Sequence, residues 1–357
     1  MSSNYHEQIR REEIKTLRGL VSELPPPIEE FMLGISESTS VRTRVGYARD
    51  LKIFFAFLSE PGRKLAGLSM GDISLEHIAI LDAMDIRRYL EYVTYYTRKV
   101  STTGSKEIEL EAYNESRAKQ RKLSAVRRMF EYFYKNEKIL SNPAELVDTP
   151  KIKGKNITYL QSDEVAKLLD EVESGAQLDG RRRIYHAINR LRDVAIITLF
   201  LGTGVRISEL VGINLEHIDM DTSGISIMRK GGKEDVVYFG DEVRRALEAY
   251  IEKRGTIEPL EGNEGALFLS TQRRRITTRA VQNLVKKYAK LVSPLKNISP
   301  HKLRSTYGTA LYNETGDIYL VAEVLGHADI NTTKKHYANM PFDKKRKAAD
   351  AVKLRDN

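Results

Sequence analysis

A polar segment near the middle of the chain divides it into two parts and so limits the folds available to it. Residues 142–155 contain Pro143 and Pro150 and end with three lysines and a glycine. The residue before a proline avoids the helical conformation and glycine loosens the backbone, so the segment predicts an extended linker. A chain of 357 residues has room for two domains of ordinary size. We therefore expect a first domain over residues 25–141, a linker over 142–157 and a second domain over 158–340.

The first domain shows helical periodicity and no alternating strand pattern. Apolar residues recur at helical spacing after Ser40, a residue type that often caps the start of a helix. Further amphipathic stretches cover residues 76–96 and 116–136. This pattern predicts an all-helical domain. Residues 1–24, which three prolines follow, are expected to form a helix or an arm.

The second domain combines helices with a small β-sheet. Residues 191–212 are apolar and helical apart from a break at residues 202–204, where two glycines flank a threonine. Residues 224–230 alternate like a strand, two glycines suit a turn, and residues 236–238 bring the chain back, which predicts a β-hairpin. The predicted fold class is therefore mainly α with a small β-sheet, an all-helical domain joined to a mixed α/β domain.

Composition excludes several classes of function. The chain has no cysteine, which excludes a disulfide scaffold, a Cys-ligated metal site and a thiol nucleophile. No two of its seven histidines are spaced i, i+4, and no compact acidic trio suggests a two-metal nuclease, so we expect no metal and no cofactor. No apolar run approaches the ~18 residues of a membrane helix, and the polar amino terminus lacks the apolar core of a secretory signal. We expect a cytoplasmic, nucleoid-associated protein with no membrane partner.

Charge points to a polyanionic partner. Lysine and arginine number 58 against 49 acidic residues, a formal balance of +9, and most of this surplus lies after residue 150. A basic surplus of this kind is typical of proteins that bind nucleic acid.

Four short segments of the second domain carry residues suited to phosphate chemistry. Each has an ordinary explanation when taken singly, since a lone arginine in a helix is usually a surface charge and a basic hairpin tip is usually solvated. Their order along the chain gives them meaning. The segments are 203–210 with Arg206 and Glu209, 229–233 with Lys230, 301–304 with His301 and Arg304, and 325–327 with His327, followed ten residues later by Tyr337.

Together and in this order, the segments resemble the tyrosine recombinase (phage integrase) family. They match its motifs R-x-S-E, K-G-x-K, H-x-L-R, L-G-H and a terminal tyrosine across residues 155–340. The RKGGK and PHKLR segments are most similar to Xer-type recombinases, notably the single-recombinase (XerS-like) branch. The resemblance implies a two-domain, C-shaped clamp in which a core-binding domain and a catalytic domain hold DNA. It also implies that the tail over residues 341–357 docks on a neighbouring protomer.

The physical chemistry of phosphoryl transfer favours the same assignment. Negative charge builds on the non-bridging oxygens in the transition state, and the planar guanidinium groups of Arg206 and Arg304 suit those oxygens. Lys230, on its hairpin, is expected to protonate the 5′-oxygen as it leaves. Tyr337 is the expected nucleophile. Its unperturbed pKa of about 10 leaves little phenolate at neutral pH, so cationic neighbours or a base must assist it.

The remaining motif residues are expected to support this chemistry. His301 is expected to donate to the phosphate or to help deprotonate the tyrosine, and His327 to add a further donor. Glu209 is expected to hold Arg206 in place or to support the turn, in preference to a direct part in catalysis.

Two features depart from the common family pattern. Many relatives have a histidine directly after the second arginine, where this chain has Ser305, so we expect one donor fewer beside Arg304. The interval from His327 to Tyr337 is ten residues, where nine is more usual. The neighbouring His336 is interpreted as a packing or flanking group, which keeps Tyr337 as the expected nucleophile.

Basic stretches in both domains predict contacts to double-stranded DNA. Residues 116–136 combine closely spaced cations with an apolar face, which fits a helix lying along phosphates or in a groove, although a solvated helix face is the alternative. In the second domain Arg279 and Gln282 are expected on base edges. The predicted DNA contacts are Arg42, Arg44, Arg117, Lys119, Arg121, Lys122, Arg127, Arg273, Arg274, Arg275, Thr278, Arg279 and Gln282.

The resemblance further implies an assembly. Four protomers, a homotetramer on two DNA recombination sites, would exchange strands pairwise through a Holliday junction without metal or ATP. Two biological roles stay open. The one we expect is Xer-type chromosome dimer resolution, which serves chromosome partition in the cell cycle with an FtsK-type DNA translocase as partner. The other is integration or excision of a mobile genetic element. A type IB topoisomerase and a non-catalytic DNA-binding regulator are further alternatives.

Overall fold

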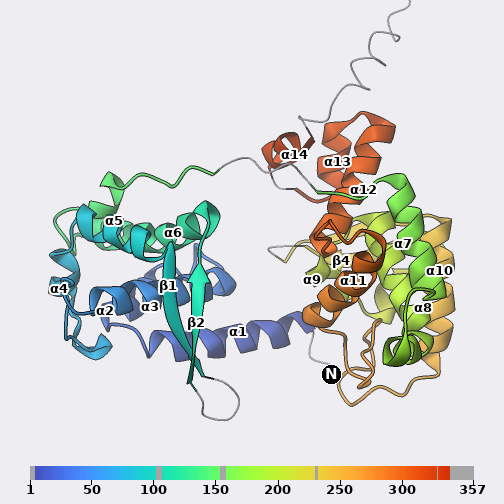
Figure 1. The fold of residues 1–357 in the computed structure, drawn as a ribbon, viewed down its shortest axis with the longest axis horizontal. Coiled ribbons are helices and arrows are strands. Elements are labelled where there is room, and N and C mark those ends of the chain that lie inside the picture. The colour runs from blue at the N-terminus through green and yellow to red at the C-terminus, as the bar shows by residue number, and fades with distance from the viewer. Residues whose placement is uncertain (1–4, 102–106, 153–157, 230–231, 328, 338–357) are drawn as a thin grey trace, which may run out of the picture. The chain divides into compact units, whose positions relative to one another are not determined.

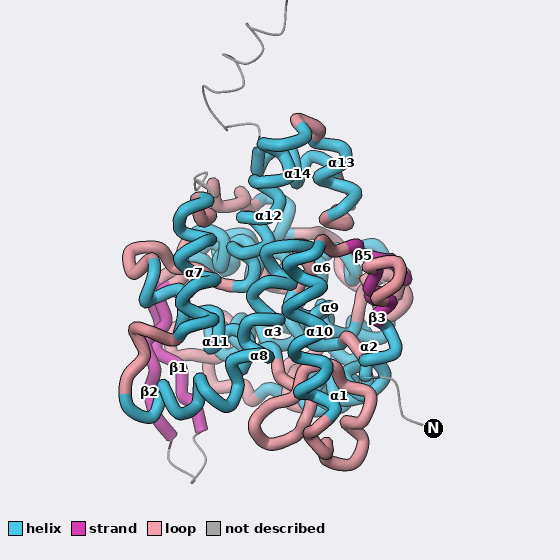
Figure 2. Tube along the Cα trace, turned by 90° about the vertical axis from the view of Figure 1, so that its right-hand side faces the viewer, coloured by secondary structure: helices cyan, strands magenta, loops and turns pink. Residues whose placement is uncertain are grey.

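The described residues of the computed structural model form two compact units, divided between residues 154 and 155 (Figure 1). Helices dominate both units, and the few strands lie in two small sheets (Figure 2). The predicted fold class, mainly α with a small β-sheet, is therefore confirmed. Among the described residues, no helix combines the length and apolar character needed to cross a bilayer. The structure describes residues 5–101, 107–152, 158–229, 232–327 and 329–337.

The first unit packs its helices around an aromatic core. Phe31, Phe54 and Phe130 come from three different helices and are fully buried. Ser40 caps the third helix, because its Oγ accepts a hydrogen bond from the backbone N of Thr43 at 3.3 Å. The helices are α1 (Tyr5–Val21), α2 (Pro27–Gly34), α3 (Val41–Leu58), α4 (Leu75–Ala79), α5 (Ala83–Tyr92) and α6 (Ser116–Lys135), with the 3-10 turns η1 (Met70–Asp72) and η2 (Pro143–Leu146).

Helix α1 is an integral part of this unit. It packs along α3, and Leu17 belongs to the buried core. Arg42 of α3 donates to Glu13 of α1 at 2.7 Å. The described part of residues 1–24 is therefore a helix of the first unit.

A β-hairpin interrupts the helical order of the first unit, so the prediction of an all-helical domain is wrong here. Strands β1 (Tyr95–Ser101) and β2 (Glu107–Tyr113) pair antiparallel, with Tyr95 opposite Tyr113 (Figure 1). Residues 107–113 alternate glutamate with apolar side chains, the period-two pattern of a strand. That alternation was the available signal.

The helix expected over residues 76–96 is also broken. Asp82 separates α4 from α5 and caps α5, since its carboxylate accepts from the backbone N of Met84 at 2.7 Å. Helix α5 ends at Tyr92, and strand β1 begins three residues later. A capping aspartate in mid-pattern ends one helix and starts another even where the apolar spacing continues.

The first part of the expected linker packs on the first unit. Pro143 and Ala144 of η2 are buried. Arg127 of α6 donates to the backbone oxygens of Ala144 and Val147 and to Thr149 Oγ1, the last at 2.6 Å. These contacts bind residues 143–149 to α6.

The second unit is built around α8, against which α7, α10 and α12 pack. The predicted hairpin is confirmed: β4 and β5 pair antiparallel with Ile225 opposite Val237, and β3 extends this sheet in the order β3-β4-β5. The elements are α7 (Ser162–Ser174), α8 (Gly180–Thr203), α9 (Ile207–Gly212), η3 (Leu215–His217), β3 (Ile218–Asp219), β4 (Gly224–Met228), β5 (Glu234–Tyr238), α10 (Asp241–Gly255), α11 (Thr278–Val292), α12 (Pro300–Thr315), α13 (Ile318–Val324) and α14 (Ile330–Tyr337).

A glycine turn ends α8 and directs the chain into the candidate site. Gly204 adopts a left-handed φ of 63°, which glycine tolerates best. A Cβ at this position would lie 2.5 Å from Tyr307 Cδ1 and 2.8 Å from Leu325 Cδ2. The close packing of α12 and the end of α13 against this turn therefore requires glycine, and it brings segments about 100 residues apart together.

Candidate active site

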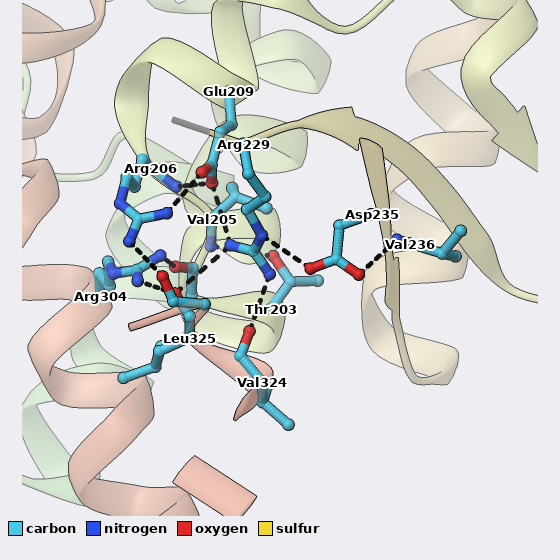
Figure 3. A network of polar contacts seen from close by, with 12 residues as sticks. Thr203, Val205, Arg206, Glu209, Arg229, Asp235, Val236, Arg304, Val324 and Leu325 are labelled. Atoms are coloured by element: carbon cyan, nitrogen blue, oxygen red, sulfur yellow. Dashed lines mark hydrogen bonds and ion pairs between the residues drawn. The ribbon is translucent and has the colours of Figure 1, made fainter. Parts of the chain in front are cut away.

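Arg206 lies at the start of α9, directly after the glycine turn. Its Nη1 donates to Glu209 Oε1 at 2.7 Å, and its backbone N donates to Glu209 Oε2 at 2.7 Å (Figure 3). Glu209 is buried, whereas the Arg206 side chain keeps 31% of its surface exposed. Glu209 thus orients an arginine that solvent, and so a ligand, can still reach.

Arg304 reaches the same place from α12. It is only 4% exposed, and its Nη1 donates to the backbone oxygen of Gly204 at 2.6 Å. Its Nη2 donates to the backbone oxygen of Leu325, while Arg206 Nη2 donates to that of Gly326 at 2.8 Å. The loop after α13 therefore binds both arginines through neighbouring carbonyls.

A third arginine, Arg229, lies in the same network and was missed by sequence reasoning. It is 8% exposed and follows β4. Its Nε donates to Asp235 Oδ2 at 2.9 Å and its Nη2 to the backbone oxygen of Val324 at 3.0 Å (Figure 3). The available signal was the strand alternation: Ile225 and Ile227 are buried, and Arg229 continues the same face.

The glycine of the L-G-H motif makes room for this arginine. Gly326 has a φ of 58°, and a Cβ there would lie 2.8 Å from Arg229 Cζ. The backbone conformation and the close approach of Arg229 each favour glycine. The motif therefore has a packing role in addition to its histidine.

The two candidate histidines take different positions. His301 lies in the first turn of α12 and is exposed, one helical turn before Arg304. His327 is half-buried, and its Nδ1 lies 2.7 Å from Thr333 Oγ1 in α14. That contact ties the loop of the L-G-H motif to the helix whose last described residue is Tyr337.

Ser305 follows Arg304 directly, at the position where we expected one donor fewer. Its Oγ donates to the backbone oxygen of His301 at 3.0 Å, within α12. Burial raises the pKa of the nearby Tyr307 phenol, which disfavours its phenolate.

Three predicted features lie wholly or partly outside the described residues. They are Lys230, the side chain of Tyr337 and the tail over residues 341–357. The structure therefore brings together Arg206, Glu209 and Arg304, with His301 on the helix of Arg304.

The network carries an excess of positive charge. Three guanidinium groups meet two carboxylates, Glu209 and Asp235, and backbone carbonyls accept most of the other donors. A carbonyl orients a guanidinium without cancelling its charge, so such a site is prepared to stabilise an anionic phosphate. Within the described ranges, no group of three or more His, Asp or Glu side chains is arranged to hold a metal ion.

The predicted DNA contacts of the first unit divide into exposed and internal cations. Arg42, Arg117 and Arg121 are exposed, although Arg42 also donates to Glu13 and Arg121 to Asp50. Lys122 is 3% exposed and its Nζ lies 3.5 Å from Asp50 Oδ1, which corrects its assignment, because a lysine buried on a carboxylate is not presented to DNA. The others donate internally: Lys119 to Thr94 Oγ1, Arg44 to the backbone oxygen of Met32, and Arg127 to residues 144–149.

The second unit shows the same division. Arg273, Arg274, Thr278, Arg279 and Gln282 are exposed, and the last three lie at the start of α11. Arg275 instead donates to the backbone oxygens of Val211 and Ile213, each at 3.0 Å, and to Asn214 Oδ1 at 2.6 Å. Its guanidinium thus joins the loop before α11 to the end of α9.

Comparison with known proteins places this geometry in a family. Residues 158–343 match the phage integrase family. Tyrosine recombinase XerC of Caldanaerobacter subterraneus subsp. tengcongensis is 32% identical over 339 residues, covering 91% of this chain and 86% of the relative.

Solved structures show the same fold. XerH bound to a palindromic difH substrate, in a post-cleavage complex, has a TM-score of 0.62 at 19% identity and covers 94% of this chain and 93% of its own. The Tn1549 transposon integrase in complex with circular intermediate DNA has a TM-score of 0.63 at 19% identity, covering 90% and 98%. With the family match and the XerC relative, these findings identify the chain as a member of the phage integrase family of tyrosine recombinases, enzymes that transfer DNA strands.

Proposed function

We propose that this recombinase cuts and rejoins DNA through a 3′-phosphotyrosyl intermediate on Tyr337. The observation that carries the proposal is the convergence of Arg206 and Arg304 on the carbonyls of residues 325 and 326. The same loop leads, through the contact of His327 with Thr333, into α14. The loop of residues 325–327 thus contacts both proposed phosphate-binding arginines and the helix that carries Tyr337.

The chemical step balances without a cofactor. The Tyr337 oxygen attacks phosphorus and loses its proton, the bond from phosphorus to the 5′-oxygen breaks, and that oxygen takes up a proton. We assign its donor to Lys230 from the family resemblance. Arg206 and Arg304 stabilise the non-bridging oxygens. The phosphoester energy is kept in the protein–DNA bond, and a second 5′-hydroxyl reverses the step.

The proposed setting is a homotetramer on two double-stranded DNA sites, with the first unit as core-binding domain and the second as catalytic domain. Strands would exchange through a Holliday junction, and the carboxy-terminal tail would dock on a neighbouring protomer. The likeness to XerC supports an Xer-type role in chromosome dimer resolution in the cytoplasm, with an FtsK-type translocase as partner. The likeness in fold to the Tn1549 integrase supports the mobile-element role as second candidate.

The first experiment maps the covalent intermediate. The protein is incubated with host genomic DNA and denatured, and the DNA strands that remain attached to protein are sequenced. A nicked suicide duplex is then built on the recovered site. We expect the unmodified protein to accumulate an adduct on it and Tyr337→Phe to bind the same duplex without forming one. Binding without an adduct by the unmodified protein would support the regulator alternative instead.

A second assay separates recombination from topoisomerase activity. A supercoiled plasmid carrying one mapped site is compared with a plasmid carrying two. We expect recombinant products from the two-site plasmid, and these products should depend on Tyr337. Relaxation of the one-site plasmid with no recombinants from the other would favour a type IB topoisomerase.

A further inference from the structure

We propose that Arg229 is a positioning residue for DNA cleavage, which holds Arg206 and Arg304 in the geometry that the phosphate requires. The inference rests on the proposed function, because it assigns these two arginines to the scissile phosphate. Arg229 belongs to the RKGGK segment, in which the resemblance assigns the chemistry to Lys230 and not to Arg229.

Arg229 binds the acceptors that the other two arginines use. Its Nη1 lies 3.4 Å from Glu209 Oε2, the oxygen that accepts from the backbone N of Arg206. The same Nη1 lies 3.4 Å from the backbone oxygen of Leu325, which accepts from Arg304. Arg229 therefore connects the support of one catalytic arginine to the support of the other (Figure 3).

The carboxylate partners of Arg229 distinguish its role from that of a phosphate ligand, since burial alone does not: Arg304 is 4% exposed and Arg229 8%. Arg229 pairs with two carboxylates, Glu209 and Asp235, which offset its charge within the protein. Its donors face Asp235, Glu209 and the carbonyls of residues 324 and 325. The guanidinium is thus engaged with the protein and acts on DNA through its neighbours.

Loss of this guanidinium would release several groups together. Glu209 would lose one of its two cationic partners, and the carbonyls of Val324 and Leu325 would lose a donor. Buried acceptors without donors reorganise or take up water. Because phosphate-binding groups must be held within about 0.5 Å, a small shift of this loop is enough to slow cleavage.

The test compares three suicide substrates that carry different chemical groups at the scissile position. One is the natural phosphodiester. The second is a methylphosphonate, in which a methyl group replaces one charged oxygen, so cleavage depends less on the arginines. The third carries a 5′-bridging sulfur, a better leaving group that needs no proton donor. Rates of adduct formation are measured for the unmodified protein, Arg229→Gln and Arg229→Lys.

We expect Arg229→Gln to cleave the phosphodiester about 100-fold more slowly and the methylphosphonate less than 10-fold more slowly than the unmodified protein. Arg229→Lys keeps the charge with fewer directed donors, so its cleavage of the phosphodiester should be slowed less. Its rate defect should again be smaller on the methylphosphonate than on the phosphodiester. The lysine variant also keeps the test valid if the glutamine variant does not fold, which far-UV circular dichroism reports.

Arg254→Gln is the matched control. Arg254 is an equally buried arginine of the second unit, and it donates to the backbone oxygens of Ala266, Ile257 and Glu264. Its loss should lower stability and reduce cleavage of all three substrates by the same factor. If Arg229→Gln slowed adduct formation on all three substrates by the same factor, it would behave like this control, and the proposal would be overturned.

Two other outcomes are also decisive. Relief on the 5′-sulfur substrate alone would mean that Arg229 acts on protonation of the leaving group, which contradicts a role through the two arginines. An unmodified protein that forms no adduct on any substrate would overturn the proposed function, and this inference with it. If only the positioning role is wrong, the unmodified protein still forms the adduct at its normal rate.

Discussion

Two buried carboxylates, one in each unit, hold cations in different ways. Asp50 of the first unit is 1% exposed, and its partner Lys122 is almost as deeply buried. Glu209 of the second unit is 4% exposed but holds Arg206, whose side chain remains open to solvent. Each carboxylate thus pairs with one buried cation, Lys122 or Arg229, and with one arginine that solvent reaches, Arg121 or Arg206.

The cations around Asp50 and those around Glu209 differ in the acceptors to which they donate. The cations at Asp50 pair with the carboxylate itself, and Lys122 also lies 5.8 Å from the ring centre of Tyr96. Near Glu209, backbone carbonyls of residues 324–326 take up many of the guanidinium donors. Neutral acceptors fix the direction of a cation and leave its charge available. The carbonyls therefore orient the arginines of the Glu209 cluster without cancelling their charge.

The largest expected effect is that of Arg206 on the rate of cleavage. Arg206→Ala should slow adduct formation on the suicide duplex about 10²–10³-fold, because it removes a charge-assisted donor to the developing oxyanion. Its unfolding free energy should change less than that of Asp50→Ala, because the buried Glu209 keeps its second partner, Arg229. Single-turnover cleavage and urea unfolding measure the two effects. A variant that cleaves at the normal rate would remove the contrast between the clusters.

The opposite pattern is expected at Asp50. Asp50→Ala leaves the buried Lys122 without its carboxylate, which should cost about 3–5 kcal/mol of unfolding free energy in urea. Cleavage by the protein that remains folded should stay within threefold of normal. Lys122→Met is the matched variant and should be less destabilised, because Asp50 keeps its second partner, Arg121. Equal stability of the two variants would contradict the structural role of this pair.

Gly326 tests how tightly the carbonyl support is packed. Gly326→Ala adds a Cβ that would lie 2.8 Å from Arg229 Cζ, in a left-handed conformation. We expect a loss of about 2 kcal/mol and a cleavage rate lowered about tenfold. Gly316→Ala is the control, because Gly316 has a φ of 71° and open space around its Cβ position. It should show the backbone cost of about 1 kcal/mol, with near-normal cleavage.

The smallest effect is a pH-dependent one at Glu164, which joins α7 to the end of α11. Burial would raise the pKa of this carboxyl, but hydrogen bonds from Lys296, Ser293 and the backbone N of Gln161 outweigh it and lower the pKa to about 2. A lowered pKa stabilises the fold above the unfolded value of 4.5, and this contribution is lost as the pH falls toward 2.

The measurement compares urea unfolding of the unmodified protein and Glu164→Gln at pH 6 and pH 3. We expect the variant to be less stable by about 1–2 kcal/mol at pH 6 and by less than half of that at pH 3. A difference that does not change with pH would show that the charge on Glu164 is unimportant. Unlike Glu209, this carboxylate would then serve only as a hydrogen-bond acceptor.

Local patterns allowed part of the fold to be predicted. The break after α8 and the β4–β5 hairpin follow from glycines and alternation that a short window contains. The hairpin of residues 95–113 was missed because helical spacing was extended past Tyr92, where α5 ends, and because the alternation of residues 107–113 was not used. The site residues Arg206, Glu209 and Arg304 were identified through motif order, while Arg229 was treated as part of a solvated tip.

The sequence by itself determined which side chains carry phosphate chemistry, because residue types and their order are written along the chain. It also showed where the glycines at 204 and 326 stand, because each lies within one short motif of the sequence. Only the tertiary structure decided that Lys122 and Arg275 face inward and that Arg229 joins the supports of two distant arginines. The physical reason is that burial and hydrogen-bond partners come from segments tens of residues away, which no local pattern contains.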